Sequence, residues 1–158
     1  MGAENPAHYK SHPSGVECIQ VIYPLFYGAG NAIKYLWRLG MKDEDLQELS
    51  KAMWYVMHSM DADMDYDWLD NPFASRVAFN MWQDAEPEGY RKWAIQFIYM
   101  GDYTNAMKVI KDWYADIMGI DVIDVIEPVV PTVAINPYAL EEHPVLPGVE
   151  PERNYIIQ

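Results

Sequence analysis

Five polar residues near the start of the chain have the types and the spacing of an anion-binding site. If residues 31–39 form a helix, its residues three and four positions apart share one side. That side then carries Asn31, Lys34, Tyr35 and Arg38, and Lys42 follows just beyond the helix end. Two or three cations beside neutral donors suit a phosphate group. The same spacing is also typical of cations that only solvate the outer face of an amphipathic helix.

The distribution of charge favours the anion-binding interpretation. The 158 residues include 11 Lys and Arg against 24 Asp and Glu, which gives a formal net charge of −13. Residues 1–42 hold four basic and two acidic side chains, so this segment carries +2 and residues 43–158 carry −15. The acidic remainder repels polyanions, so we expect no nucleic-acid partner and no anionic membrane surface, whereas a small phosphate compound can still bind the basic segment.

Four further residues are candidates for the same site. His8 and Tyr9 stand in an N-terminal arm, and a histidine there could handle protons, contact a phosphate or bind a metal, because its pKa lies near physiological pH. Glu17 and Asp45 could orient a cation or bind Mg²⁺ through water. Both acids also stand where the start of a helix favours negative charge, which is the alternative explanation.

Several familiar sites are missing from the sequence. Cys18 is the only cysteine, which excludes an intrachain disulfide and a cysteine-based zinc site, and no GxxxxGK[ST] phosphate loop occurs. Aspartates alternate over residues 61–67 as in a calcium loop, but Tyr66 and Pro72 occupy the positions of its glycine and its bidentate acid. We therefore predict no metal site. No signal peptide and no membrane span are expected, and a reducing cytoplasm is the natural location.

Helical periodicity dominates residues 16–118. The apolar spacing predicts a mainly α domain over residues 1–119 with five to six helices, in which Pro24 kinks or stops the first helix and residues 28–31 form a break. The helices are expected over residues 16–27, 31–39, 43–60, 73–82, 90–100 and 103–118. Residues 120–126 could form one strand, and residues 120–158 are predicted to be an extended, proline-rich arm that packs on the domain or on a neighbouring subunit.

The N-terminal motifs together resemble the bacteriophage SaV-like family, over about residues 5–60. The resemblance rests on ordered elements at family-like separations, namely His8-Tyr9, Gly15-Val-Glu17-Cys-Ile19, the run from Gly30-Asn31 through Lys34-Tyr35 and Arg38 to Lys42, Asp45-Leu46, and Lys51-Ala52-Met-Trp54-Tyr55. That family includes a deoxynucleoside monophosphate kinase. The resemblance implies a phage protein of nucleotide metabolism that acts in the cytoplasm of the infected host.

A kinase-like phosphotransferase without a P-loop would use these residues in two ways. His8, Lys34 and Arg38 are the expected catalytic residues, and the expected substrate-binding residues are Tyr9, Asn31, Tyr35, Lys42, Glu17 and Asp45. A nucleoside triphosphate would donate the phosphate, and Mg²⁺ could accompany it. A nucleotide-binding or sequestering protein without turnover and an acidic host-interaction protein are the alternatives. We also expect a homo-oligomer, through an aromatic surface and the C-terminal arm.

Overall fold

Helices make up most of the part of the chain that the structure describes. The structure is a computed structural model, and it describes residues 6–62 and 66–121. Within these ranges it contains no strand, and its helices are η1 (Ala7–Tyr9), α1 (Cys18–Ile22), α2 (Tyr27–Trp37), α3 (Asp45–Asp61), η2 (Trp68–Asp70), α4 (Phe73–Ala85), α5 (Tyr90–Tyr99) and α6 (Tyr103–Met118). The predicted mainly α fold is confirmed. The predicted arm lies outside the described residues beyond Asp121, as does most of the segment proposed as a strand.

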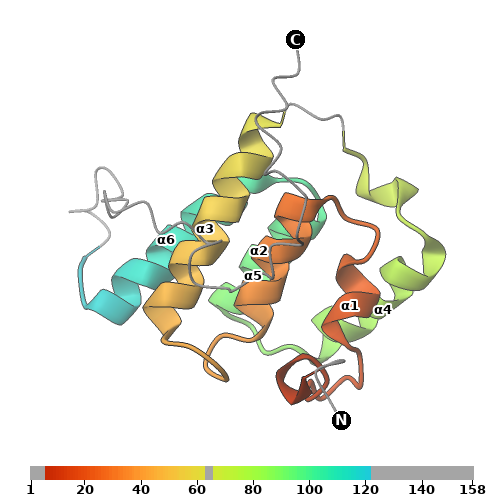
Figure 1. The fold of residues 1–158 in the computed structure, drawn as a ribbon, viewed down its shortest axis with the longest axis horizontal. Coiled ribbons are helices and arrows are strands. Elements are labelled where there is room, and N and C mark those ends of the chain that lie inside the picture. The colour runs from red at the N-terminus through yellow and green to blue at the C-terminus, as the bar shows by residue number, and fades with distance from the viewer. Residues whose placement is uncertain (1–5, 63–65, 122–158) are drawn as a thin grey trace, which may run out of the picture. The chain divides into compact units, whose positions relative to one another are not determined.

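Helix α2 lies at the centre of the helical unit (Figure 1). It packs against α1, α3 and α5, while α6 packs on α3 and α5, and α4 packs on α1. Its apolar residues Ala32, Ile33 and Leu36 are fully buried, and burial of a large aliphatic side chain such as Ile33 or Leu36 contributes about 1.5–3 kcal/mol. The residues at the end of α2 are therefore held on a firmly packed element of the fold.

The first helix stops early, as the position of Pro24 predicts. Helix α1 ends at Ile22, and Tyr23 is its C-cap residue. Proline disfavours the helical conformation of the residue before it and cannot donate a helical hydrogen bond. The chain then turns into α2, so one predicted helix over residues 16–27 becomes a short helix and the start of the next.

The predicted break at residues 28–31 is wrong, because these residues lie inside α2. Neither glycine there forms a turn, and Gly28 serves close packing. A Cβ atom on Gly28 would lie 2.6 Å from Ser59 Oγ of α3, and one on Gly30 would lie 3.6 Å from the carbonyl oxygen of Ile22. The absence of side chains lets neighbouring elements approach the backbone of α2.

The later helices agree with the periodicity within a few residues. Helix α6 spans Tyr103–Met118 and ends at Gly119, whose left-handed φ of 68° is the usual geometry of a helix-terminating glycine. Asp102 caps its start by accepting a hydrogen bond from the backbone N–H of Asn105. None of the helices in the described ranges has the length and the apolar character needed to cross a membrane.

Candidate functional site

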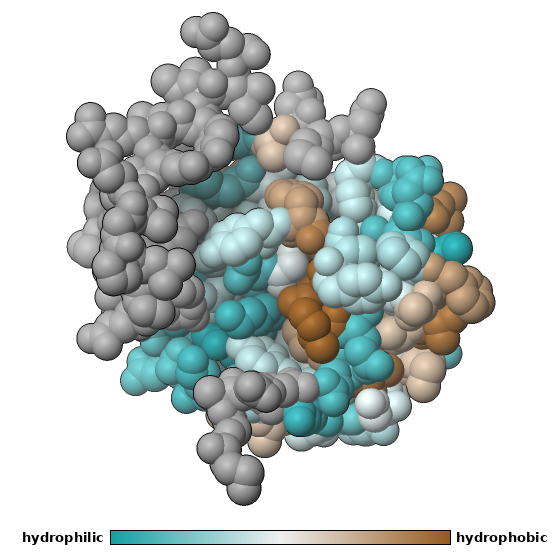
Figure 2. Space-filling view, turned by 45° about the vertical axis from the view of Figure 1, so that its right-hand side comes forward, coloured by the Kyte–Doolittle hydropathy of each residue, from teal (hydrophilic) through white to brown (hydrophobic). Residues whose placement is uncertain are grey.

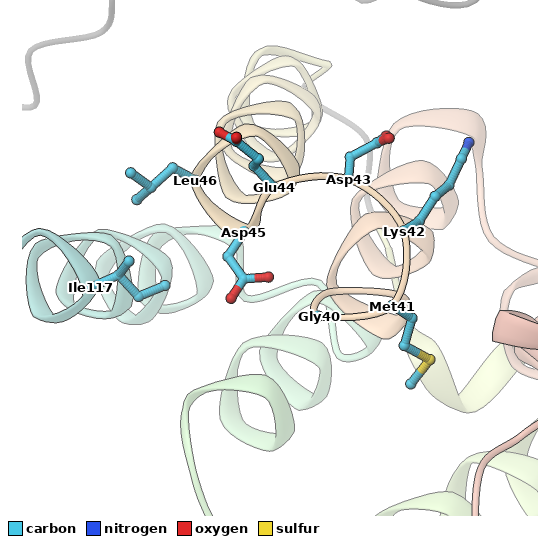
Figure 3. A pocket seen from close by; sticks show the side chains of 8 residues that line it. All are labelled: Gly40, Met41, Lys42, Asp43, Glu44, Asp45, Leu46 and Ile117. Carbon is cyan, nitrogen blue, oxygen red and sulfur yellow. The ribbon is translucent and has the colours of Figure 1, made fainter.

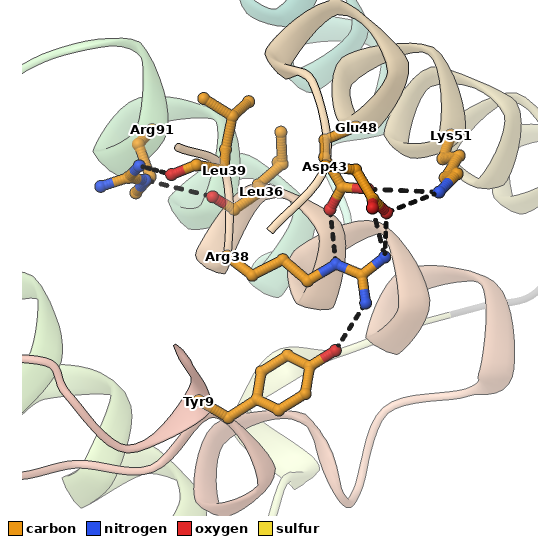
Figure 4. Close-up of polar contacts among 8 residues, drawn as sticks. All are labelled: Tyr9, Leu36, Arg38, Leu39, Asp43, Glu48, Lys51 and Arg91. Atoms are coloured by element: carbon orange, nitrogen blue, oxygen red, sulfur yellow. Dashed lines mark hydrogen bonds and ion pairs between the residues drawn. The ribbon is translucent and has the colours of Figure 1, made fainter. Parts of the chain in front are cut away.

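Arg38 lies at the C-terminal end of α2, and its guanidinium is buried and held by hydrogen bonds from all three of its nitrogens. The residue is 1% exposed. Its Nε and Nη2 atoms donate to the two carboxylate oxygens of Glu48, the second at 3.1 Å, and Nη1 donates to Tyr9 Oη at 2.9 Å (Figure 4). Two parallel hydrogen bonds between a guanidinium and a carboxylate are both strong and directional. Arg38 therefore joins α2 to α3 and to the N-terminal arm.

Lys51 and Asp43 complete a balanced cluster of two cations and two carboxylates. The Lys51 Nζ atom lies 3.2 Å from Glu48 Oε1 and 3.3 Å from Asp43 Oδ2. Burial alone would lower the pKa of Arg38, but its hydrogen bonds and charge interactions with Glu48 and Tyr9 together outweigh that effect and raise it. A charge can be buried at this depth only when it is paired and hydrogen-bonded. Arg38 is thus permanently charged and already committed to protein partners.

The aromatic ring of Tyr35 packs beneath the two cations of this cluster. Its centroid lies 4.5 Å from Arg38 Cζ and 5.2 Å from Lys51 Nζ, and the ring stacks on Tyr55 with a centroid distance of 5.6 Å. Cations over an aromatic face are attracted by its quadrupole. Tyr35 is buried, so a nucleobase would have to displace these neighbours in order to stack on it.

The N-terminal arm places His8 in a positive electrostatic potential. Burial lowers the pKa of His8, and the charges of Arg38, Lys42 and Lys34 lower it further, whereas Glu48 opposes them. Its Nε2 atom is buried and has no hydrogen-bond partner, and its ring packs edge-on against Tyr9 at 4.2 Å. His8 is therefore a neutral imidazole at pH 7, in a position that favours a negative charge nearby.

Three of the predicted cations lower the pKa of His8, although these cations differ in exposure. Arg38 is buried, Lys34 is half-buried and Lys42 is exposed. Lys34 Nζ lies 5.7 Å from the centroid of the Tyr35 ring. Asn31 is half-buried, and its Nδ2 atom donates to the carbonyl oxygen of Tyr27 at 2.8 Å. We call His8, Lys34, Arg38 and Lys42 the basic cluster.

The two predicted acids stand at helix starts. Glu17 is the N-cap residue of α1, and its backbone N–H donates to Gln20 Oε1 at 2.7 Å. Asp45 is the first residue of α3 and lines an open hollow of about 590 Å³ together with Lys42 and Ile117, and the side chains of Asp45 and Lys42 extend in different directions there (Figure 3). The structure therefore does not direct Asp45 and Lys42 toward one ligand.

Glu48, Lys51 and Asp43 are the site residues that sequence reasoning missed. Glu48 stands in the first turn of α3, where an acidic residue is usually explained by the helix dipole. Its spacing of three residues from Lys51 was the only local signal. Its bond to Arg38 depends on how α2 and α3 pack, which a spacing pattern does not contain.

A second polar network supports the end of α2 from the other side. His12 Nε2 lies 2.8 Å from Glu86 Oε2. Because His12 Nδ1 accepts a hydrogen bond from the backbone N–H of Ser14, the proton belongs on Nε2 and is donated to Glu86. Arg91 pairs with Glu86 at 3.6 Å and donates to the carbonyl oxygens of Leu36 and Leu39 (Figure 4).

These contacts supply side-chain donors to carbonyl groups at the C-terminal end of α2, where the helix provides few donors; the carbonyl of Leu36 also accepts from the backbone N–H of Leu39. They join residues more than fifty positions apart in the chain, so no local sequence motif predicts them. In the ranges 6–62 and 66–121, no three His, Cys, Asp or Glu side chains converge as ligands for a metal ion.

Comparison with known proteins gives one match. A family model described as a protein of unknown function, DUF3310, matches residues 3–57. No curated protein and no solved structure matches the chain. The matched range contains the whole basic cluster with Tyr9, Glu48 and Lys51, whereas Glu86 and Arg91 lie outside it.

Proposed function

We propose that this protein belongs to nucleotide metabolism as a SaV-like, deoxynucleoside monophosphate kinase-like phosphotransferase that lacks a P-loop. Its substrate phosphate would bind at the basic cluster. The observation that carries the proposal is positive charge placed beside His8: the buried guanidinium of Arg38 donates to Tyr9, the neighbour of His8, at 2.9 Å, and the charges of Arg38, Lys42 and Lys34 add to burial in lowering the pKa of His8. A phosphate bound beside His8 would offset these positive charges.

The chemistry of phosphoryl transfer suits such a site. An oxygen of the monophosphate forms a bond to the γ-phosphorus of a nucleoside triphosphate. The bond between that phosphorus and the oxygen bridging the β- and γ-phosphates breaks, which releases a nucleoside diphosphate. The protein needs to align both reactants and to stabilise charge on their oxygens, without covalent participation. Cations fixed before the substrate arrives do this without reorganisation.

The solvent exposure of each residue indicates its role in this reaction. Lys42 and Lys34 would contact the phosphate, since Lys42 is exposed and Lys34 is half-buried. Arg38 would supply a fixed positive charge and hold Tyr9 through the hydrogen bond at 2.9 Å. His8 would take up a proton when the phosphate dianion binds, because the added negative charge favours the imidazolium.

A binding protein without turnover is the second candidate, and the state of Arg38 favours it. Each of its three side-chain nitrogens already donates to Glu48 or Tyr9. A guanidinium that holds the fold together is less available to follow charge as it develops on a transferring phosphoryl group.

The test is an incubation of the full chain with mixed deoxynucleoside monophosphates and nucleoside triphosphates, with chromatography of the products. Lys42→Ala should reduce product formation at least tenfold, and Lys108→Ala, which removes an exposed lysine of α6, should leave it unchanged. If calorimetry detects binding but no pair of substrates gives a product, the protein is a binding protein and not an enzyme. If the protein shows no binding and no turnover, both proposed functions are contradicted.

A further inference from the structure

Helices α1 and α4 together expose an apolar surface. Phe73 is 73% exposed, and Met81 is 51% exposed. Figure 2 turns the side of the molecule that carries α1 and α4 toward the viewer, and apolar side chains reach the surface there. We call the exposed large side chains of these two helices the α1–α4 face, which consists of Ile19, Tyr23, Phe73, Val77 and Met81.

The residues of this face follow helical spacing on each of two helices that pack together. Phe73, Val77 and Met81 follow one another every four residues along α4, and Ile19 and Tyr23 stand four residues apart on α1 and its C-cap. Residues with this spacing lie on one side of a helix, and α1 packs against α4. Soluble monomers rarely expose contiguous apolar patches of this kind without a partner.

Charge identifies the kind of partner. The chain has a net charge of −13, so two copies repel each other over most of their surface. Helices α1 and α4, in contrast, contain only one cation, Arg76, and one anion, Asp84. The α1–α4 face is therefore a neutral, apolar surface on an acidic protein, where a second copy can approach without like-charge repulsion.

We propose that the α1–α4 face binds the same face of a second copy of this chain in a two-fold symmetric dimer. In such an interface each contact occurs twice. If the two α4 helices cross antiparallel with Asn80 at the axis, Arg76 of one protomer faces Asp84 of its partner, four residues to either side. Both charges are then paired at the rim, and Val77 and Met81 are buried between the helices, while Phe73 lies opposite residue 87 of the partner, just beyond the end of its α4.

The first experiment measures the mass of the full chain in solution by sedimentation. The wild type should sediment as a dimer, and Met81→Glu should raise the dissociation constant more than tenfold because it buries a charge in the interface. Met57→Glu is the matched control, since Met57 is an exposed methionine of α3, and it should remain a dimer. If the wild type sediments as a monomer, the proposal is overturned, and the α1–α4 face would instead bind residues 122–158 or another protein.

Two further measurements do not depend on an apolar substitution. Asn80→Cys should form a disulfide-linked dimer on oxidation, because it is exposed and lies at the axis, and Met57→Cys should not; the native Cys18 is buried. Arg76→Glu and Asp84→Arg should each weaken the dimer, and their combination should restore it. A dimer that persists in Met81→Glu while Asn80→Cys fails to cross-link would overturn the proposal.

Discussion

At the scale of single residues, the buried pair of Arg38 and Glu48 organises the candidate site. It fixes the guanidinium of Arg38, which belongs to the basic cluster, and through Arg38 it fixes Tyr9 of the arm. Burying two charges is not in itself stabilising, but leaving either one alone is costly. The pair is therefore a strict requirement of the fold around the site.

Replacing Glu48 by Gln tests this requirement. The variant leaves Arg38 and Lys51 without their shared buried carboxylate, and we expect a loss of about 3–5 kcal/mol in the free energy of unfolding. Urea denaturation measures it. Glu44→Gln is the control, because Glu44 is an exposed glutamate four residues away. A loss in Glu48→Gln no larger than in this control would show that the pair is dispensable.

The lowered pKa of His8 predicts a pH dependence of stability. Its folded-state pKa lies below 6.5, so the unfolded chain binds the proton more readily than the folded protein. Stability contributed by neutral His8 is present above pH 6.5 and is lost as the pH falls toward the folded-state value. His8→Gln should lose less stability than the wild type between pH 7.5 and 5 in thermal unfolding. Equal losses would disprove the assignment.

The sequence contained only part of this site. Lys34, Arg38 and Lys42 could be grouped from spacing and local charge, and the charge of each lowers the pKa of His8. The partner of Arg38 could not be found, because Glu48 belongs to another helix and its burial depends on tertiary packing. His12 and Glu86, 74 positions apart in the chain, are a stronger case of the same limitation.

At the scale of elements, Gly28 of α2 lets α2 and α3 approach closely. A Cβ atom on Gly28 would lie 2.6 Å from Ser59 Oγ, so this position has no room for a side chain. Gly30 has its nearest neighbour at 3.6 Å, an ordinary contact distance. The two glycines share one helix and differ only in their surroundings.

Alanine substitutions at these two glycines should have opposite effects. Gly28→Ala forces α3 or Ser59 to move, which costs about 1–3 kcal/mol and exceeds or cancels the gain of about 1 kcal/mol in helix propensity. Gly30→Ala gains that propensity without a clash and should stabilise the protein. Urea denaturation compares the two. A destabilising Gly30→Ala together with a stabilising Gly28→Ala would contradict the packing described here.

Helix starts and ends were predictable where local chemistry decides them. Pro24 stops α1 and Gly119 ends α6, because each acts through its own backbone. The start of α2 was misplaced, because glycine favours a break in isolation but allows close packing inside a folded protein. Tertiary contacts, and not the local preference of glycine for a break, determine where α2 begins.

At the scale of the whole molecule, the acidic surface should restrict the ligand to small phosphate compounds. Residues 43–158 carry −15, while residues 1–42 carry +2. A deoxynucleoside monophosphate can reach the basic cluster, whereas a long polyanion must also approach the acidic remainder.

A competition experiment tests this restriction. A single-stranded oligonucleotide of about twenty residues should compete with a bound fluorescent deoxynucleoside monophosphate no better than one free monophosphate does, since its added phosphates gain no cations. Fluorescence anisotropy at 0.15 M salt measures this. Tighter binding of the oligonucleotide would show that the protein is a nucleic-acid binder.

The most direct test of the proposed function is the pKa of His8, measured by NMR titration of its imidazole in the full chain with and without a saturating deoxynucleoside monophosphate. His8→Gln assigns the signal. A phosphate bound at the basic cluster should raise this pKa by at least one unit, because its negative charge offsets Arg38, Lys42 and Lys34. An unchanged pKa in the nucleotide-saturated protein would place the phosphate elsewhere and would contradict the proposed site.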